Sequence, residues 1–338
     1  MLSRAWSKVG SVGFFPLVLI VLVGMNLVIL CLQIVLGDFP ISVNDAFKAV
    51  AGIGNERYDL VVNRFRFPRA LVGFLVGAGL ALSGVILQGI TRNPLASPGV
   101  IGLNSGAALL TVSAIILVPA FPVALLPFAA FLGAFLAAAL SYMLAWRRGL
   151  SAVRLVLVGV SISASAGAFV TFLLTFSDIY DAKRAVVWMT GSIYGRSWEH
   201  FWPLLPWLLV LFPLLMLLGK QLDVIQLGDE LAKGLGSRLE RSRGILLLIS
   251  VSLAGASVAM AGTIGFVGLM APHISRYLVG AASRRLMPTA ALIGGMIVML
   301  ADLLGRTLLR PMEIPCGILI AMIGAPYMIY LLYKKRNM

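Results

Sequence analysis

Residues 12–36 read VGFFPLVLIVLVGMNLVILCLQIVL, a run without a single charged side chain. A membrane-spanning helix needs about 20 consecutive apolar residues, whereas a spanning strand needs about 10 residues of alternating polarity. Because unpaired backbone amides are costly in hydrocarbon, a continuous run of this length predicts a helix that crosses a bilayer. The run is too long for the apolar core of a secretory signal, and no small-x-small cleavage site closes it, so we expect a retained first span.

Similar apolar runs follow along the whole chain. Of the 338 residues, 60% are hydrophobic and 12% are charged, which is about half the charged share of a soluble protein. We therefore predict an all-α polytopic membrane protein with about ten transmembrane helices, organised as a single domain over residues 1–338. The expected spans are residues 12–36, 68–90, 100–118, 121–146, 152–176, 201–219, 244–262, 264–280, 287–305 and 315–333.

Basic residues are unevenly divided between the two faces that these spans define. With the N-terminus inside, the larger share of the 27 lysines and arginines lies inside, and such an excess marks the cytoplasmic side. Both termini are therefore expected in the cytoplasm. Because the positive charge is divided among several loops, a nucleic-acid-binding surface is not expected.

Two polar segments interrupt the apolar pattern. Residues 37–67 mix basic and acidic side chains on the outer side and predict a folded extracytoplasmic lip. On the inner side, residues 220–243 contain the sequence LGDELAKGLG at 227–236, typical of a short amphipathic helix. That helix could lie on the lipid surface. However, Asp229 and Glu230 would then face an often anionic leaflet, which favours a groove on a soluble protein partner.

The sequence offers little for catalysis or metal binding. No Gly-x-x-x-x-Gly-Lys-Ser/Thr phosphate loop occurs, so an ATPase that drives transport would be another chain. Cys31 and Cys316 fall within expected spans, and His200 and His273 lack the paired spacing of a zinc site. We expect no catalytic residue, metal site or cofactor on this chain. Carboxylates are absent from the middle of the spans, which argues against an ion-coupled secondary transporter.

Small polar residues mark one span. Ser161, Ser163 and Ser165 alternate along residues 152–176. They could line an aqueous translocation path, or pack with their hydroxyls bonded back to the helix backbone.

The turn at residues 91–99 contains Asn93 and Pro94 and a second proline, which enforce a rigid non-helical connection. The turn could be a connector, a gate or a partner-facing loop.

A charged cluster closes the ninth expected span. Asp302, Arg306, Arg310 and Glu313 lie at its outer end and in the following loop. Charges near the membrane should pair or face water, and the four-residue spacing of Asp302 and Arg306 predicts an i,i+4 ion pair.

Several motifs occur together in one order along the chain. They are RFPR at 66–69, GLALSG at 79–84 with Gln88, NPLASP at 93–98, Leu227-Gly228 with Ala232 and Leu235-Gly236, GTIGFVG at 262–268 with Pro272-His273, Ala301-Asp302 with Arg306, and Glu313-Ile314-Pro315 with Gly317. Through these motifs the chain resembles, over nearly its full length, the FecCD-type permeases, the membrane subunits of ABC importers for iron(III)-siderophores, haem and cobalamin.

The resemblance implies a type II importer fold in the bacterial cytoplasmic membrane. Two permease subunits, identical or related, would each dock on a cytoplasmic ATPase that holds ATP and magnesium, and an extracytoplasmic substrate-binding protein would deliver an iron(III)-siderophore. Haem or cobalamin is the alternative cargo. The resemblance assigns ATPase coupling to Leu227, Gly228, Asp229, Glu230, Leu231, Ala232, Leu235 and Gly236, binding-protein docking to Arg66, Arg69 and Arg306, and the path to Ser161, Ser163 and Ser165.

Overall fold

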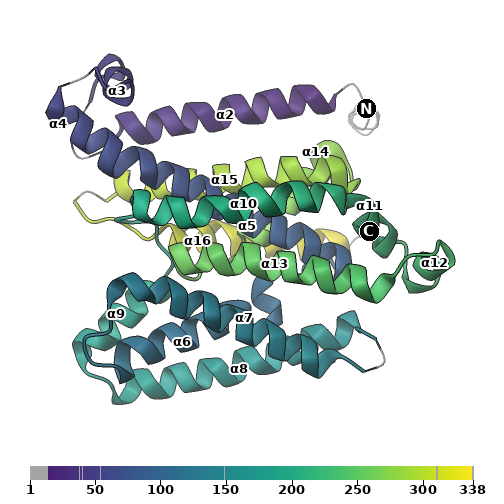
Figure 1. Cartoon of the computed structure of the whole chain (residues 1–338). Coiled ribbons are helices and arrows are strands. Elements are labelled where there is room, and N and C mark those ends of the chain that lie inside the picture. The colour runs from purple at the N-terminus through teal and green to yellow at the C-terminus, as the bar shows by residue number, and fades with distance from the viewer. Residues whose placement is uncertain are drawn as a thin grey trace.

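The computed structural model describes residues 14–37, 39, 41–53, 55–147, 149–309 and 311–336, and this part of the chain is almost entirely helical (Figure 1). The first two residues of the expected first span and the side chain of Arg310 lie outside the described residues. The helices are α2 (Phe15–Val35), α3 (Val43–Val50), α4 (Glu56–Asp59), the π-helix η1 (Leu60–Arg66), α5 (Phe67–Thr91), the 3-10 helix η2 (Pro98–Ile101), α6 (Leu103–Leu117), the 3-10 helix η3 (Val123–Leu125), α7 (Leu126–Ala145), α8 (Ala152–Phe176), α9 (Ile179–Met189), α10 (Trp198–Leu217), α11 (Gly219–Gln226), α12 (Asp229–Gly234), α13 (Leu239–Ala261), α14 (Val267–Val279), α15 (Ser283–Thr307) and α16 (Cys316–Arg336).

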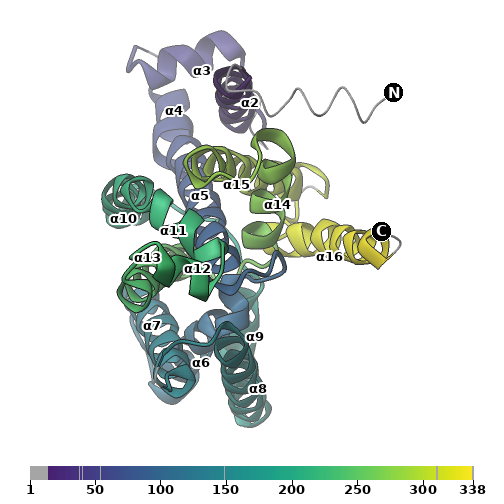
Figure 2. The ribbon, with the colours of Figure 1, turned by 90° about the vertical axis from the view of Figure 1, so that its right-hand side faces the viewer.

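Helix α5 lies at the centre, with α10 and α13 on one side and α14 and α15 on the other (Figure 2). Glycines allow its neighbours to approach closely. A Cβ atom on Gly77 would lie 2.1 Å from the carbonyl oxygen of Gly294 in α15, and one on Gly84 would lie 2.0 Å from that of Gly268 in α14. Larger residues at these positions would therefore separate the central helices.

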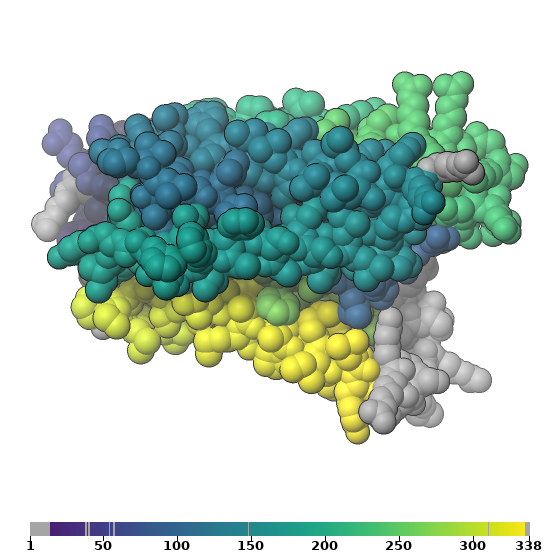
Figure 3. Space-filling model, turned by 90° about the horizontal axis from the view of Figure 1, so that it is seen from below, coloured from purple at the N-terminus to yellow at the C-terminus, as the bar shows by residue number. Residues whose placement is uncertain are grey.

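Two groups of helices flank this centre. Helix α2 and the lip lie on one side, and α6, α7, α8 and α9 form a layer on the other (Figures 1 and 2). The segment that carries α8 and the C-terminal helix α16 both appear on the face shown in Figure 3. Helix α2 begins and α16 ends at the same end of the bundle as α12 (Figure 1).

Each expected span corresponds to a helix, but two helices are short. In the part of the chain that the structure describes, eight helices are long and apolar enough to cross a membrane, whereas α6 has 15 residues and α14 has 13. Helix α14 starts at Val267 because left-handed backbone angles at Gly262 (φ 74°) and Phe266 (φ 63°) interrupt the chain before it. At about 1.5 Å per residue, α14 is shorter than a bilayer core of about 30 Å.

The outer segments contain more helix than the sequence indicated. Helix α3 is capped by Ser42, whose hydroxyl accepts the backbone N–H of Asp45, and the lip has a small core of its own with Ile41 and Val62. The second span begins at Leu60 rather than at 68, because η1 continues into α5. No element was expected where α9 lies, between the fifth and sixth spans.

Candidate functional site

The outer end of the bundle contains a buried ion cluster around Arg69 of α5. One guanidinium nitrogen of Arg69 lies 2.7 Å from a carboxylate oxygen of Asp302 in α15 and 2.7 Å from one of Glu313. The side chains of Arg69 and Asp302 are 12% and 3% exposed. Buried charges are stable only when they are paired and hydrogen-bonded, and here one planar guanidinium satisfies two carboxylates.

Two more arginines bind the outer end of α2. Arg306 donates to the backbone carbonyl of Gln33 and, at 2.8 Å, to its side-chain oxygen. Arg66 donates to the carbonyls of Ile34 at 2.7 Å and Phe39 at 2.6 Å. The last carbonyls of a helix have no partner within the helix and carry its negative dipole end, so both arginines hold the end of α2 in place.

The expected ion pair between Asp302 and Arg306 is wrong. Asp302 instead accepts hydrogen bonds from Arg69 and from Gln33. Arg306 turns toward α2, where unpaired carbonyls need a donor. Arg69 instead donates to Asp302 through Nε and Nη2, one edge of its planar group. The structure thus brings Arg66, Arg69 and Arg306 to one end of the molecule. Their side chains are largely buried there and bonded within the chain, and their docking role stays a prediction.

Three non-helical segments lie beneath this end, before α10, α14 and α16. The first of them is bonded to two helix ends. The N–H of Ser192 donates to the carbonyl of Ala261, the last residue of α13, at 2.7 Å, and the carbonyl of Gly191 accepts the N–H of Gly317, in the first turn of α16, at 3.0 Å. Non-helical backbone within a membrane protein must be satisfied by other protein groups, and these bonds meet that requirement.

Arg196 lies in the loop before α10. Its Nη1 is 2.8 Å from Nε2 of His200. A guanidinium can only donate, so Nε2 accepts from Arg196. Nδ1 of the same ring lies 3.4 Å from the backbone nitrogen of Ser197 and 3.3 Å from its hydroxyl. Burial lowers the pKa of Arg196, but an arginine remains charged in proteins.

At the inner end, helix α12 is attached to the bundle through Asp229. The carboxylate lies 2.6 Å from Arg243 of α13 and 3.1 Å from Arg92 at the end of α5. Arg243 is 2% exposed and also donates to the carbonyl of Leu150. The hydrogen bond from Arg243 is the main cause that lowers the pKa of Asp229 below its ordinary value. Asp229 is thus an ionised anchor rather than a free surface carboxylate.

The rest of the expected coupling segment faces outward. Leu227, Leu231 and Leu235 are 57%, 62% and 66% exposed, and Glu230 is also exposed, whereas Ala232 is fully buried. Gly228 and Gly236 have positive φ angles of 112° and 74°, which favour glycine. The helix is shorter than expected, because these two glycines bracket it.

The turn with Asn93 and Pro94 lies beside α12. The side-chain oxygen of Asn93 accepts the N–H of Leu95 at 2.9 Å, which makes a local Asx turn. Its neighbour Arg92 forms the ion pair with Asp229. The turn and helix α12 are therefore joined.

The serines of α8 lie on the outer edge of the chain. Ser161 and Ser165 are exposed and Ser163 is half-buried. The hydroxyl of Ser161 donates to the carbonyl of Leu157 at 3.0 Å, as the packing alternative anticipates.

Sequence reasoning missed three polar residues of these ends: Gln33, Arg92 and Arg243. Gln33 is a polar residue within an apolar run, which is a usable signal because such groups need a buried partner. Arg92 and Arg243 carried no comparable signal, since basic residues are common at the inner ends of spans.

This geometry defines a multi-span helical membrane protein with an anchored, leucine-bearing helix projecting from its inner end. The chain belongs to the FecCD transport family, whose model matches residues 25–334. Family membership confirms the resemblance drawn from the sequence. It makes the chain a membrane transport protein rather than an enzyme.

Individual relatives agree with this family. The chain is 43% identical over 319 residues to the Fe(3+)-citrate import system permease protein YfmE of Bacillus subtilis, covering 94% of this chain and 95% of that protein. It is 41% identical over 331 residues to the iron(3+)-hydroxamate import system permease protein FhuG of the same organism, covering 96% of each. A solved structure described as a metal-chelate type ABC transporter in an inward-facing conformation matches with a TM-score of 0.86 at 34% identity, over 94% of this chain and 99% of that one. The expected fold class is confirmed.

Proposed function

We propose that this chain is the membrane-spanning permease subunit of a bacterial ABC importer that carries an iron(III)-siderophore complex into the cytoplasm. Relatives that match almost the whole chain are named for import of ferric citrate and ferric hydroxamate. Both cargoes are intact iron chelates. From these relatives we infer the same class of cargo for this chain, namely iron(III) bound by an organic chelator.

The observation that carries the proposal is the form of helix α12. Leu231 is exposed on α12, and Leu227 and Leu235 are exposed just before and just after this helix, which an ion pair ties to the bundle. Exposed apolar side chains gathered at one place mark a protein contact, and an amphipathic helix suits a groove. The occupant of the inner face would be the ATPase, which holds ATP and magnesium, so this chain needs no cofactor of its own.

The remaining partners occupy the other faces. A second permease subunit, identical or related, would cover the serine-bearing face of α8 and complete the translocation path. The extracytoplasmic binding protein would dock on the outer end near Arg66, Arg69 and Arg306, and lipid would surround the exposed apolar helices. The whole chain, residues 1–338, would act as one permease domain, with the Asn93-Pro94 turn at its inner gate.

Purification in mild detergent from iron-limited cells tests the proposal. We expect an ABC ATPase at one copy per permease, with hydrolysis stimulated by the binding protein loaded with a ferric chelate. Stimulation by haem or cobalamin instead would change the cargo. Uptake driven by an ion gradient without ATP would overturn the importer class.

A further inference from the structure

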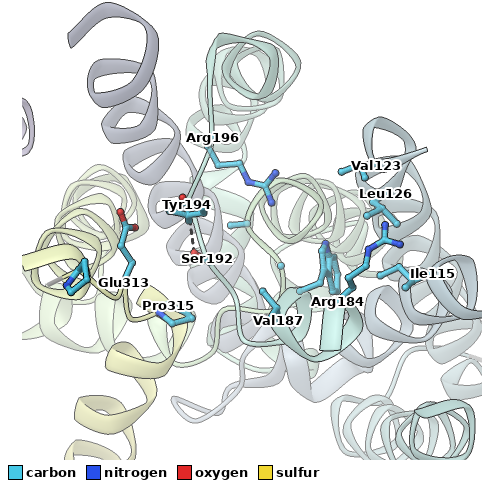
Figure 4. Close-up of a pocket in the computed structure, with 14 residues that line it drawn as sticks. Ile115, Val123, Leu126, Arg184, Val187, Ser192, Tyr194, Arg196, Glu313 and Pro315 are labelled. Carbon is cyan, nitrogen blue, oxygen red and sulfur yellow. Dashed lines mark hydrogen bonds between the residues drawn. The ribbon is translucent and has the colours of Figure 1, made fainter. Parts of the chain in front are cut away.

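The outer end of the molecule contains a cavity of about 570 Å³ (Figure 4). Its walls come from the ends of α6 and α7, from α9, from the loop before α10, from the end of α13 and from the loop before α16. Sites for small molecules usually measure about 300–1,000 Å³, so a compact chelate would fit. A second cavity of about 370 Å³ shares Tyr194, Arg196 and Glu313 with the first.

Two guanidinium groups line the larger cavity. Figure 4 shows Arg196 reaching in from the loop before α10, and Arg184 rising from α9. The Nε atom of Arg196 is buried without a hydrogen-bond partner. Arg184 contacts Asp181 at 3.3 Å, and both side chains are more than a third exposed, so this pair is weak.

The acidic side chain that lines the cavity, Glu313, does not balance these charges. Its carboxylate is 2.7 Å from Arg69, outside the larger cavity. Arg69 also lines the second cavity, together with Arg66 and Arg306. Among the described lining residues, the positive charge therefore exceeds the negative charge.

The bottom of the cavity is formed by the three non-helical segments. Its lining includes Ser192, Gly262 and Pro315, one residue from each of the non-helical segments before α10, α14 and α16. A molecule in this cavity would rest directly on these segments.

We propose that this cavity receives the incoming ferric chelate and selects an anionic one, bearing free carboxylate or catecholate oxygens, through Arg184 and Arg196. The inference rests on the proposed importer function and names its substrate class. Guanidinium groups bind such oxygens with paired hydrogen bonds, and the partly enclosed surroundings strengthen the attraction. A neutral ferric trihydroxamate lacks the charge that these arginines would compensate.

The test uses the complete importer in proteoliposomes with its binding protein. It compares the uptake of radiolabelled ferric citrate by the double variant, Arg184→Gln combined with Arg196→Gln, with uptake by the unchanged protein. Uptake is normalised to assembled complex. At a limiting concentration of chelate, each charge-assisted hydrogen bond that is lost should lower the uptake rate roughly tenfold. Lysine at both positions keeps the charge and should restore most of the rate. Lys183→Gln is the matched control, because Lys183 is an exposed neighbour on α9 that does not line the cavity.

The outcomes separate this inference from the function on which it rests. If the double glutamine variant carries ferric citrate at the normal rate, or if the unchanged importer carries only a neutral trihydroxamate, the anion site is wrong and the importer stands. If the importer and its binding protein carry no ferric chelate, the proposed function itself fails. Should the double variant not assemble, the single variant Arg184→Gln decides between these outcomes. The side chain of Arg184 is half-exposed and not needed for packing, so this variant should assemble and still show lower uptake.

Discussion

Arg92 at the end of α5 and Asp229 of α12 form an ion pair, with 3.1 Å between guanidinium nitrogen and carboxylate oxygen. The same carboxylate is held by Arg243 at 2.6 Å. Helix α12 is therefore fastened both to α13 and to the central helix of the bundle. A displacement of α12 by an ATPase would act directly on the inner end of α5 and on the Asn93-Pro94 turn beside it.

The anchor and the surface carboxylate of α12 should behave differently. Asp229→Asn removes the counter-charge of the buried Arg243, and we expect fewer chelates transported per ATP hydrolysed. The change should also destabilise the α12 attachment by about 1 kcal/mol, a value kept low because Asp229 is partly exposed. Glu230→Gln, on the same helix but exposed, is the control. Equal effects of the two substitutions would contradict the anchor role.

The exposed leucines should carry the contact with the ATPase. Leu231→Ser removes a side chain that is 62% exposed in this chain and that a groove would bury. Burying a leucine contributes about 1.5–3 kcal/mol, so the affinity for the ATPase should fall at least about tenfold in a titration of purified components. Ile53→Ser, which changes an apolar residue of the lip that is 77% exposed, should leave this affinity unchanged. Undiminished binding by Leu231→Ser would favour the lipid-surface alternative for α12.

The ion cluster around Arg69 should be primarily structural. Arg69→Gln leaves Asp302 buried without its main partner and should lower stability by about 3–5 kcal/mol, measured by thermal unfolding in detergent. Adding Asp302→Asn should recover part of this loss, because the uncompensated charge is then removed. A purely docking role predicts the opposite pattern, in which Arg69→Gln abolishes uptake while the unfolding temperature stays the same.

The close approach of α5 and α15 should depend on glycine. Gly77→Ala would place a Cβ atom 2.1 Å from the carbonyl oxygen of Gly294, which forces the two helices apart. Overpacking of this kind costs about 1–3 kcal/mol or more, and the yield of folded protein on size exclusion should drop. Gly167→Ala in α8 is the matched control, since its Cβ would meet nothing within 4 Å. Similar yields for both variants would show that the interface can relax.

The positions of the spans could be read from the sequence because hydropathy is a local property. An uncharged run such as 12–36 must be helical in hydrocarbon whatever surrounds it, and the distribution of lysine and arginine indicates sidedness without any tertiary contact. The glycine-bracketed segment at 227–236 was also recognisable, since its composition differs from everything around it.

The pairing of side chains was decided only by the tertiary structure. Spacing favoured Asp302 with Arg306, four residues away, but Asp302 pairs with Arg69, 233 positions distant. The direction in which a side chain leaves its helix depends on how the helices pack. Here Arg306 donates to the free carbonyls at the end of α2 instead of pairing with Asp302. The same packing buries the arginines expected at the surface and gathers Arg184 and Arg196 around one cavity. Sequence thus determined which segments span the membrane and on which side they end, whereas helix packing determined which charges meet.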